Sequence, residues 1–335
     1  MGTENEEKDR KMDRKQEIIH TLLLVLAAFI WGTAFVAQSV GSGIVGPFTF
    51  LACRGWIGLL FLAGVIRAND TIQYKRMRRA LQTGAAGAAS GSDVAEIFRP
   101  VTKAQRKSLL LGSLFCGLAL FFAQLTQQIG IAHTTTAKSS FITALYCIIV
   151  PVLSVFLGHR PHWKVWTCVV MGVIGLYLLC MKPGEIGFGF GDLLTLISSF
   201  LFAVQILIVD HVIKRVDGIR LSAGQLFIMA FISTWVMIFV ERPGIELICQ
   251  ALPSLIYAGV FSSGIAFTLQ IIAQQGLNPT IASLAMCLES VFGALAGWAL
   301  QGQSLAGREL FGCVLMFAAI VYSQVDLKSL KKKGV

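Results

Sequence analysis

The sequence predicts an all-α integral membrane protein with ten transmembrane helices, and three observations lead to this fold class. Ten apolar segments of membrane-spanning length follow one another along 335 residues. With 55% hydrophobic residues, 14% charged residues and a mean hydropathy of +0.72, the chain is too apolar for a water-soluble globule of this size. Basic residues gather on one side of the predicted membrane.

Each apolar segment is expected to cross the bilayer as a helix. About 20 residues rising about 1.5 Å each span a hydrocarbon layer of about 30 Å. Lipid offers no partner to backbone amides, so the crossing segments must satisfy their own hydrogen bonds. In chain order they lie near residues 18–40, 46–66, 108–131, 134–157, 165–181, 191–213, 223–241, 253–274, 278–301 and 308–325.

The charges orient the chain. With the N-terminus and every second loop on one side, that side holds 23 of the 28 Lys and Arg residues and the other side holds three. The basic regions are the N-terminal segment 1–17, the loop 67–107 and the tail 326–335. The positive-inside rule then places both termini in the cytoplasm, which requires an even number of spans. We expect a protein of the plasma (inner) membrane of a bacterium.

The net charge of +10 does not require a nucleic-acid partner, because attraction to anionic lipid explains the same basic segments. The longest connection, 67–107, contains a low-complexity run from Gly84 to Ser92. We interpret this connection as a flexible cytoplasmic insertion.

The chain divides into two similar halves, 18–181 and 191–325. Residues 27–32 line up with 198–203. Three further pairs in the third and eighth spans are separated by the same number of residues: Gly117 with Gly264, Ala119 with Ala266 and Gln127 with Gln274. Each half has five spans, an odd number, so the second half is predicted to be inverted relative to the first. Inverted repeats are typical of secondary transporters, which bind substrate near the midplane between the repeats.

The five-plus-five arrangement resembles the drug/metabolite transporter superfamily, and within it the EamA-type members. The resemblance is carried by Trp31-Gly32, by Gln128-Ile-Gly130 followed by residues 136–142 and Val150-Pro151, and by residues 288–292. It implies ten helices around a central cavity, alternating access and export of small metabolites. The chain departs from the family pattern at His159 and Gln303, where Glu is usual after Gly, and at Ser290, where Pro often follows the Glu.

Charges inside the spans are candidate functional groups, because an unpaired charge in hydrocarbon is costly. Arg54, Lys138, Asp210 and Glu289 are the candidates. Asp210 and Lys138 are near enough to a span end to snorkel. Glu289 lies mid-span, where it could bind a substrate amine, act as a protonatable coupling switch, or form a structural ion pair with Arg54.

Polar and aromatic residues complete the predicted substrate-binding set. In the span 134–157, Lys138, Ser139, Thr143 and Tyr146 share one face, which indicates a cavity or a helix-packing surface. Pro151 leaves the carbonyl of Cys147 without its helical partner, which predicts a kink. The remaining candidates are two amide pairs spaced by four residues and two aromatic residues that could stack on a substrate or fill the core: Gln124, Gln128, Gln270, Gln274, Trp31 and Phe202.

The sequence therefore predicts an exporter of small metabolites, such as amino acids or related zwitterions, that works by alternating access. A passive uniporter and an importer or exchanger of the same superfamily are alternatives, and proton coupling is open. An intramembrane enzyme is a remote alternative, because the sequence lacks recognisable catalytic motifs. We expect no catalytic residue, metal or cofactor. The partners expected are a substrate and the lipid bilayer; the oligomeric state is open.

Overall fold

The structure is a computed structural model that describes residues 14–82, 102–134, 136–158, 163–180, 189–275, 277–301 and 306–324. Every regular element in those ranges is helical, which confirms the predicted fold class. The elements are α2 (Arg14–Ser42), α3 (Pro47–Gln82), α5 (Lys103–Ala132), α6 (Thr136–Ala144), α7 (Tyr146–Phe156), α8 (Trp163–Cys180), α9 (Phe190–Val212), α10 (Gly218–Val236), η2 (Met237–Glu241), α11 (Ile245–Gln250), α12 (Leu252–Ile256), η3 (Tyr257–Ala266), α13 (Phe267–Ala273), α14 (Pro279–Met286), α15 (Leu288–Gln301) and α16 (Gly307–Gln324). The elements η2 and η3 are π-helical.

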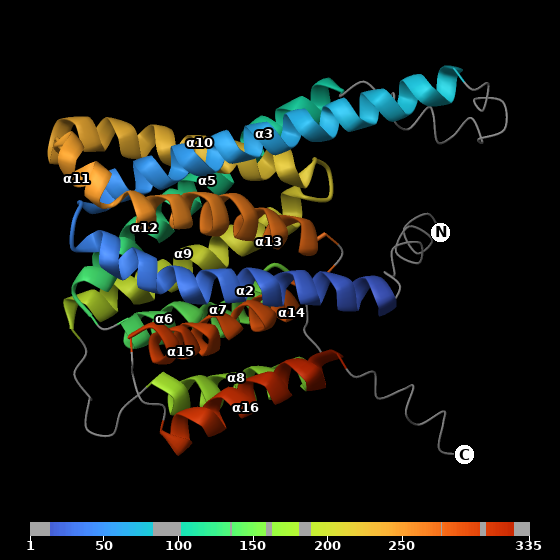
Figure 1. The fold of residues 1–335 in the computed structure, drawn as a ribbon. Helices are drawn as coiled ribbons and strands as arrows, with labels where there is room; N and C mark the ends of the chain where they lie inside the picture. Colours follow the sequence, from blue (N-terminus) through green and yellow to red (C-terminus); the bar gives the residue numbers. More distant parts are fainter. Residues whose placement is uncertain are drawn as a thin grey trace, which may run out of the picture.

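Eight helical segments of the described ranges are long and apolar enough to cross a membrane. They correspond to the first four and the sixth to ninth predicted spans. The fifth and tenth predicted spans are α8 and α16, which pack against each other along one edge of the bundle (Figure 1). The ten predicted segments are thus all helical where they are described.

One end of the bundle is distinguished by its polar residues. There α2 begins, α16 ends, and α3 extends beyond the other helices (Figure 1). We call this the basic end, because Lys15, Arg67, Lys214 and Arg220 lie at the helix termini or extensions found there. The opposite end carries the connection from α2 to α3 and the short helix α11.

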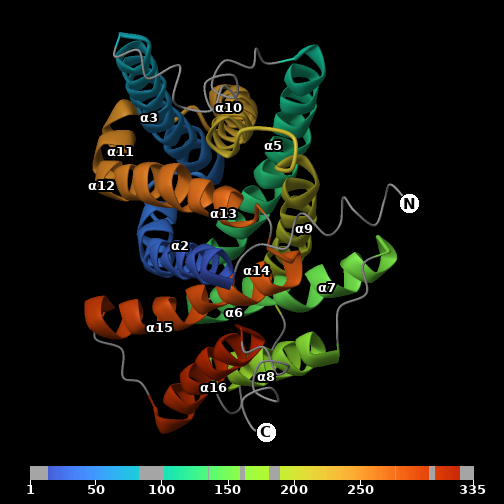
Figure 2. The ribbon, with the colours of Figure 1, turned by 90° about the vertical axis from the view of Figure 1, so that its right-hand side faces the viewer.

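The packing of the spans is nearly symmetric under exchange of the two halves. The second span pairs with the seventh, as α3 with α10, and the fifth pairs with the tenth, as α8 with α16. The third packs along the sixth, as α5 on α9, and the eighth packs along the first, as η3 and α13 on α2. Figure 2 shows α2 and α9 flanking the centre of the molecule. An inverted repeat would produce this pairing, and the inversion itself stays a prediction.

The long connection 67–107 is shorter than predicted. The helix α3 continues past the apolar segment to Gln82, and α5 begins at Lys103, so the prediction of an entirely flexible loop is wrong at both ends. The reason is that hydropathy marks only the part of a helix that crosses lipid, whereas Arg, Ala, Lys, Met and Gln after residue 66 are good helix formers in water. Thr102 and Gln105 form a capping box that starts α5. Residues 83–101, with the low-complexity run, lie outside the described ranges.

Two predicted spans are broken near their centres. The fourth is divided at Leu145 into α6 and α7, and the ninth at Cys287 into α14 and α15. The break in the fourth span lies about two turns before Pro151, outside the stretch from Cys147 to Pro151 in which the lost hydrogen bond predicts a kink. Interrupted helices at membrane depth occur where the backbone is buried in protein or lines a cavity.

Candidate functional site

A small central cavity, with about 40 Å³ accessible to water-sized molecules, lies between the two halves of the chain. The first half contributes α2, α5, α6 and α7, and the second half α9, η3, α13, α14 and α15. The lining residues are Trp31, Phe35, Gln38, Gln124, Gln127, Thr143, Tyr146, Phe202, Gln205, Ile206, Ser262, Phe267, Gln270, Met286 and Glu289.

Glu289 lies where the two broken spans meet. Its carboxylate accepts a hydrogen bond from the Tyr146 hydroxyl, with 3.1 Å between Oε1 and the phenol oxygen. Tyr146 is the first residue of α7, and Glu289 is in the first turn of α15, so each directly follows a break. The positive end of the helix dipole of α15 favours a negative charge at this position. Both residues are buried and line the cavity.

Neighbouring contacts hold the two breaks together. The Sγ atom of Cys287 donates to the carbonyl of Ala144 at 3.2 Å, and the Oγ atom of Ser290 donates to the carbonyl of Ser140 at 2.9 Å. On the other side of α15, the close approach of α2 depends on Gly32. A Cβ atom at Gly32 would lie 2.6 Å from the Glu289 carbonyl oxygen. The position of Glu289 is therefore fixed from α2, α6 and α7.

Arg54 is buried behind the cavity wall, with 1% of its surface exposed, and does not line the cavity. Its guanidinium donates to three neutral side chains: Nε to Ser263 Oγ at 2.9 Å, Nη1 to Gln124 Oε1 at 3.0 Å and Nη2 to Ser262 Oγ at 2.8 Å. The suggested ion pair between Arg54 and Glu289 is not formed. Within the described ranges, no carboxylate lies within 4 Å of the guanidinium. The sequence could not reveal this, because two of the partners are supplied by the π-helical segment η3 and the third by α5.

Four glutamines on the second-half side form a chain with a fixed direction. Gln274 Nε2 donates to the backbone carbonyl of Ile206 at 3.3 Å, and a carbonyl can only accept. Gln274 Oε1 therefore accepts from Gln270 Nε2, which also donates to Gln205 Oε1 at 3.2 Å. Gln205 Nε2 in turn donates to Gln225 Oε1 at 3.1 Å.

The fixed direction of this chain leaves one cavity acceptor free. Gln270 Oε1 is buried and has no hydrogen-bond partner among the described residues. Gln38 Oε1, on α2, is also buried and unpartnered in that part of the chain. Since unsatisfied buried polar atoms are costly, free acceptors at a cavity indicate a ligand or water that donates hydrogen bonds.

Aromatic side chains form the apolar part of the wall. The Trp31 ring packs against Phe267 with 5.0 Å between centroids, and its indole Nε1 is 3.4 Å from the Ser262 carbonyl oxygen. Phe35 and Phe202 complete this surface. Such a wall can cover the apolar part of a small ligand while the polar groups select its orientation.

The structure brings together many of the residues predicted from the sequence. Seven line the cavity: Trp31, Gln124, Thr143, Tyr146, Phe202, Gln270 and Glu289. Arg54, Gln128, Ser139 and Gln274 are buried beside it without lining it. Gln128 donates to the Gln38 carbonyl at 3.3 Å, which is a packing role. Lys138 belongs to α6, and its side chain lies outside the part of the structure that is described.

Several lining residues escaped the sequence reasoning. They are Phe35, Gln38, Gln127, Gln205, Ile206, Ser262, Phe267 and Met286. Gln38, Gln127 and Gln205 carried a usable signal, because amides within apolar spans need partners. Ser262 carried a weaker one, since Ser262-Ser263-Gly264 interrupts an otherwise apolar run. The other four are ordinary apolar core residues in sequence.

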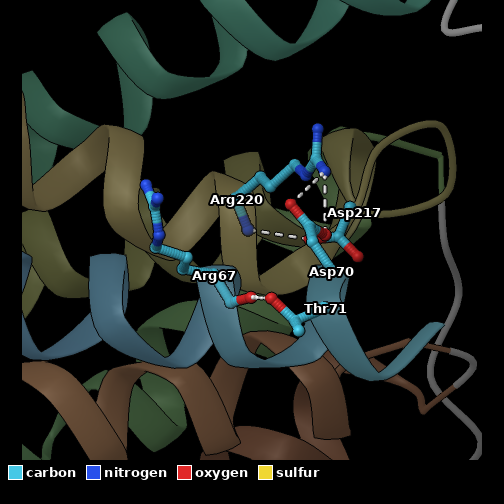
Figure 3. Close-up of polar contacts among 5 residues, drawn as sticks. All are labelled: Arg67, Asp70, Thr71, Asp217 and Arg220. Carbon is cyan, nitrogen blue, oxygen red and sulfur yellow. Dashed lines mark hydrogen bonds and ion pairs between the residues drawn. The ribbon is translucent and has the colours of Figure 1, made fainter. Parts of the chain in front are cut away.

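A second polar region lies at the basic end, between α3 and the turn that joins α9 to α10 (Figure 3). Nη2 of Arg220 is 3.3 Å from each carboxylate oxygen of Asp70, and Asp217 caps α10 by accepting from the Arg220 backbone N–H at 2.8 Å. About half of the Asp70 and Arg220 side chains is exposed. This region lines an open crevice of about 600 Å³.

At the opposite end, a carboxylate of η2, which directly follows α10, links to α3. Glu241 accepts from the backbone N–H groups of Phe48 at 2.9 Å and of Thr49 at 2.7 Å, which are free donors in the first turn of α3. Polar contacts therefore join α3 to α10 and its continuation η2 at both ends, and a hydrogen bond from Trp56 Nε1 to Thr234 Oγ1 at 2.8 Å joins α3 and α10 between them.

Comparison with known proteins agrees with this architecture. The EamA-like transporter family matches residues 18–181 and 189–323. An uncharacterized transporter of Archaeoglobus fulgidus is 23% identical over 300 residues, which cover 89% of this chain and 83% of that protein. The uncharacterized transporter YoaV of Bacillus subtilis is also 23% identical, over 89% of this chain and 94% of its own length.

The fold also matches a solved structure, whose title says only that it is the crystal structure of a protein. It superposes with a TM-score of 0.68 at 17% identity, over 94% of this chain and 99% of the other. At this identity the match shows the fold alone. The two family matches cover most of the chain and its membrane-spanning helices, so the chain belongs to the EamA-like transporter family and is an integral membrane transporter.

Proposed function

We propose that the chain is a secondary transporter that exports small metabolites carrying an ammonium group, such as amino acids or related zwitterions, by alternating access. The observation that carries this proposal is the Glu289 carboxylate, which faces a cavity built from both halves of the chain. Among the described lining residues, Glu289 is the charged one, and the others are amide, hydroxyl, aromatic or apolar.

An ammonium group fits the hydrogen-bonding capacity of this cavity. The Tyr146 hydroxyl donates to one Glu289 oxygen, and the second oxygen accepts no hydrogen bond from a described residue, so it is available to a ligand. Gln270 Oε1 and Gln38 Oε1 are acceptors without a described donor. An ammonium supplies three N–H donors and a positive charge, and it makes charge-assisted hydrogen bonds with a carboxylate.

Alternating access is supported by the position of the cavity. It lies between two halves whose spans pack in a symmetric pattern, and both broken spans reach it. Rocking of one half against the other around a fixed site would expose the cavity to each side in turn. Export is the direction that the family resemblance implies, with the basic end in the cytoplasm.

We further propose that Glu289 couples transport to protons. A protonated Glu289 cannot form an ion pair with an ammonium, so proton binding and substrate binding compete at one carboxylate. Opposite movement of protons and substrate follows from this competition. The affinity for an ammonium-bearing substrate is then expected to fall as the pH is lowered.

The test is flux through liposomes that contain the purified full-length chain. A panel of amino acids and other small metabolites is measured with and without an imposed pH gradient. Saturable, gradient-driven flux of ammonium-bearing compounds would support the proposal. Saturable flux that ignores the gradient would identify a passive uniporter, flux that requires substrate on the opposite side would identify an exchanger, and flux of none of the panel would contradict the proposal.

A further inference from the structure

The buried guanidinium of Arg54 is not explained by an ammonium site. A cation with 1% exposure would normally be paired with a carboxylate or turned to water. Its described partners are instead the neutral side chains of Ser262, Ser263 and Gln124, at 2.8 to 3.0 Å. Two of these partners, Ser262 and Gln124, line the cavity, and Ser263 does not.

The chemistry of guanidinium fixes what those two partners present to the cavity. A guanidinium only donates, so Gln124 must direct its Oε1 atom toward Arg54. The Nε2 group of Gln124, which bears two N–H donors, makes no hydrogen bond to a described residue. Ser262 Oγ likewise accepts from Arg54, and its O–H proton has no described acceptor.

We propose that Arg54 is a positioning residue that makes Gln124 and Ser262 a pair of hydrogen-bond donors for a carboxylate of the transported metabolite. This proposal rests on the proposed function and names the second charged group of its substrate. Arg54 stays behind the wall, where its charge strengthens both donors and attracts an anion across them. The substrate carboxylate would bind at Gln124 and Ser262, and its ammonium at Glu289.

The proposal also accounts for the charges of the site. Arg54 and Glu289 are buried, carry opposite charges and do not contact each other. A zwitterion with separate anionic and cationic ends would compensate both charges at once. A simple amine would compensate Glu289 and leave Arg54 without a counter-charge.

The experiment measures equilibrium binding of three probes to the purified full-length chain. L-leucine carries both charged groups, L-leucinamide has the same ammonium without the carboxylate, and 4-methylpentanoate has the carboxylate without the ammonium. The wild type is expected to bind L-leucine at least about ten-fold more tightly than L-leucinamide, as for a charge-assisted hydrogen bond. Arg54→Gln is expected to abolish this preference and leave L-leucinamide binding within about two-fold.

Other variants separate positioning from folding. Gln124→Glu replaces the amide donors by a carboxylate that can pair with Arg54, so the protein should fold and lose the preference for L-leucine. Ser262→Ala and Ser263→Ala form a matched pair, because each removes one Arg54 partner but only Ser262 lines the cavity. We expect Ser262→Ala to weaken L-leucine binding and Ser263→Ala to leave it unchanged.

The outcomes separate this proposal from the proposed function. Equal wild-type affinity for L-leucine and L-leucinamide, or variants that weaken both probes equally, would overturn the role of Arg54 and leave the ammonium site standing. Binding of 4-methylpentanoate without L-leucinamide would support the donor pair and contradict the ammonium site. Failure of all three probes to bind would contradict both proposals.

Discussion

The centre of the molecule, around the cavity, and the basic end each hold residues of opposite charge, but the charges are arranged differently. Arg54 in the centre is buried and bound by neutral groups, and Glu289 is bound by a phenol. At the basic end, Asp70 and Arg220 pair directly at 3.3 Å with about half of each side chain in solvent (Figure 3). The central charges are kept apart although both are buried, whereas the exposed charges meet.

This difference indicates where binding free energy is available. An exposed ion pair has water as an alternative partner and contributes about 0 to 1 kcal/mol. Buried charges without a counter-charge interact strongly with any ligand that supplies one, because the surroundings screen them weakly. The cavity is therefore expected to govern transport, while the ends of the bundle adjust stability and conformation.

The largest effect is expected for Glu289→Gln. Glutamine keeps the size of the side chain and can still accept from Tyr146, but it removes the charge that would bind an ammonium. A charged hydrogen bond contributes about 1.5 to 3 kcal/mol, so flux of ammonium-bearing substrates should fall about 10- to 100-fold. Liposome flux measures this, with Tyr146→Phe as a control that keeps the charge and should lose less.

The distinction between the buried central charges and the exposed pair would be wrong if the Glu289→Gln protein folded and transported normally at every pH. In that case the central charge would be structural, like the exposed pair. The substitution preserves the shape of the side chain, so thermal stability in detergent is expected to stay nearly unchanged. A variant that lost both flux and the folded state would therefore also contradict the prediction.

The next effect concerns the support of the cavity rather than its charge. Gly32→Val would place side-chain atoms against the Glu289 carbonyl and the Phe292 Cβ, each 2.6 Å from a built Cβ atom. Overpacking of this kind costs about 1 to 3 kcal/mol and should move α15 away from α2. We expect lower thermal stability in detergent and reduced flux. Gly64→Ala is the matched control, because its Cβ would meet nothing within 4 Å.

A smaller effect is expected where Glu241 caps α3 at the opposite end. Glu241→Gln keeps one acceptor but removes the negative charge next to the N-terminus of that helix. Loss of a cap or of a favourable helix-dipole interaction costs about 1 kcal/mol. Thermal stability should fall slightly in low salt and less in high salt, and binding of a cavity ligand should not change. Altered ligand affinity would show that this end is coupled to the cavity.

The membrane-spanning helices could be predicted from the sequence, because each crossing requires a run of apolar residues that is visible along the chain. It was less informative about the cavity, since which face of a helix turns inward depends on packing between distant spans. Glu289 and Tyr146 were identifiable as polar groups at membrane depth, but their contact depends on breaks at Leu145 and Cys287 that hydropathy does not record. Ser262 shows the same limit, because the π-helical turns of η3 change its angular position relative to an α-helix.

The positions of Arg54 and Glu289 show why composition was a poor guide to pairing. Two opposite charges in apolar spans suggest an ion pair, because each is costly when isolated. In the structure, Arg54 is instead bound by hydroxyl groups of η3 and an amide group of α5. These two elements are some 140 residues apart in the sequence. Pairing with neutral groups leaves the charge available, which fits a binding site better than a structural bridge.

The smallest effect is expected for Asp70→Asn at the basic end. Arg220 has water as an alternative partner, so the free energy of unfolding should change by less than about 1 kcal/mol. A double-mutant cycle with Arg220→Gln measures the pair itself, and its coupling should shrink as salt rises. The Asp70–Arg220 pair and the Glu241 contact both join α3 to the α10 side. If the Asp70–Arg220 pair controlled a conformational change during transport, Asp70→Asn would change flux without changing stability. Unchanged flux and a small, salt-dependent coupling would confine the transport chemistry to the buried charges, whereas a large change in flux would make this exposed pair part of the transport cycle.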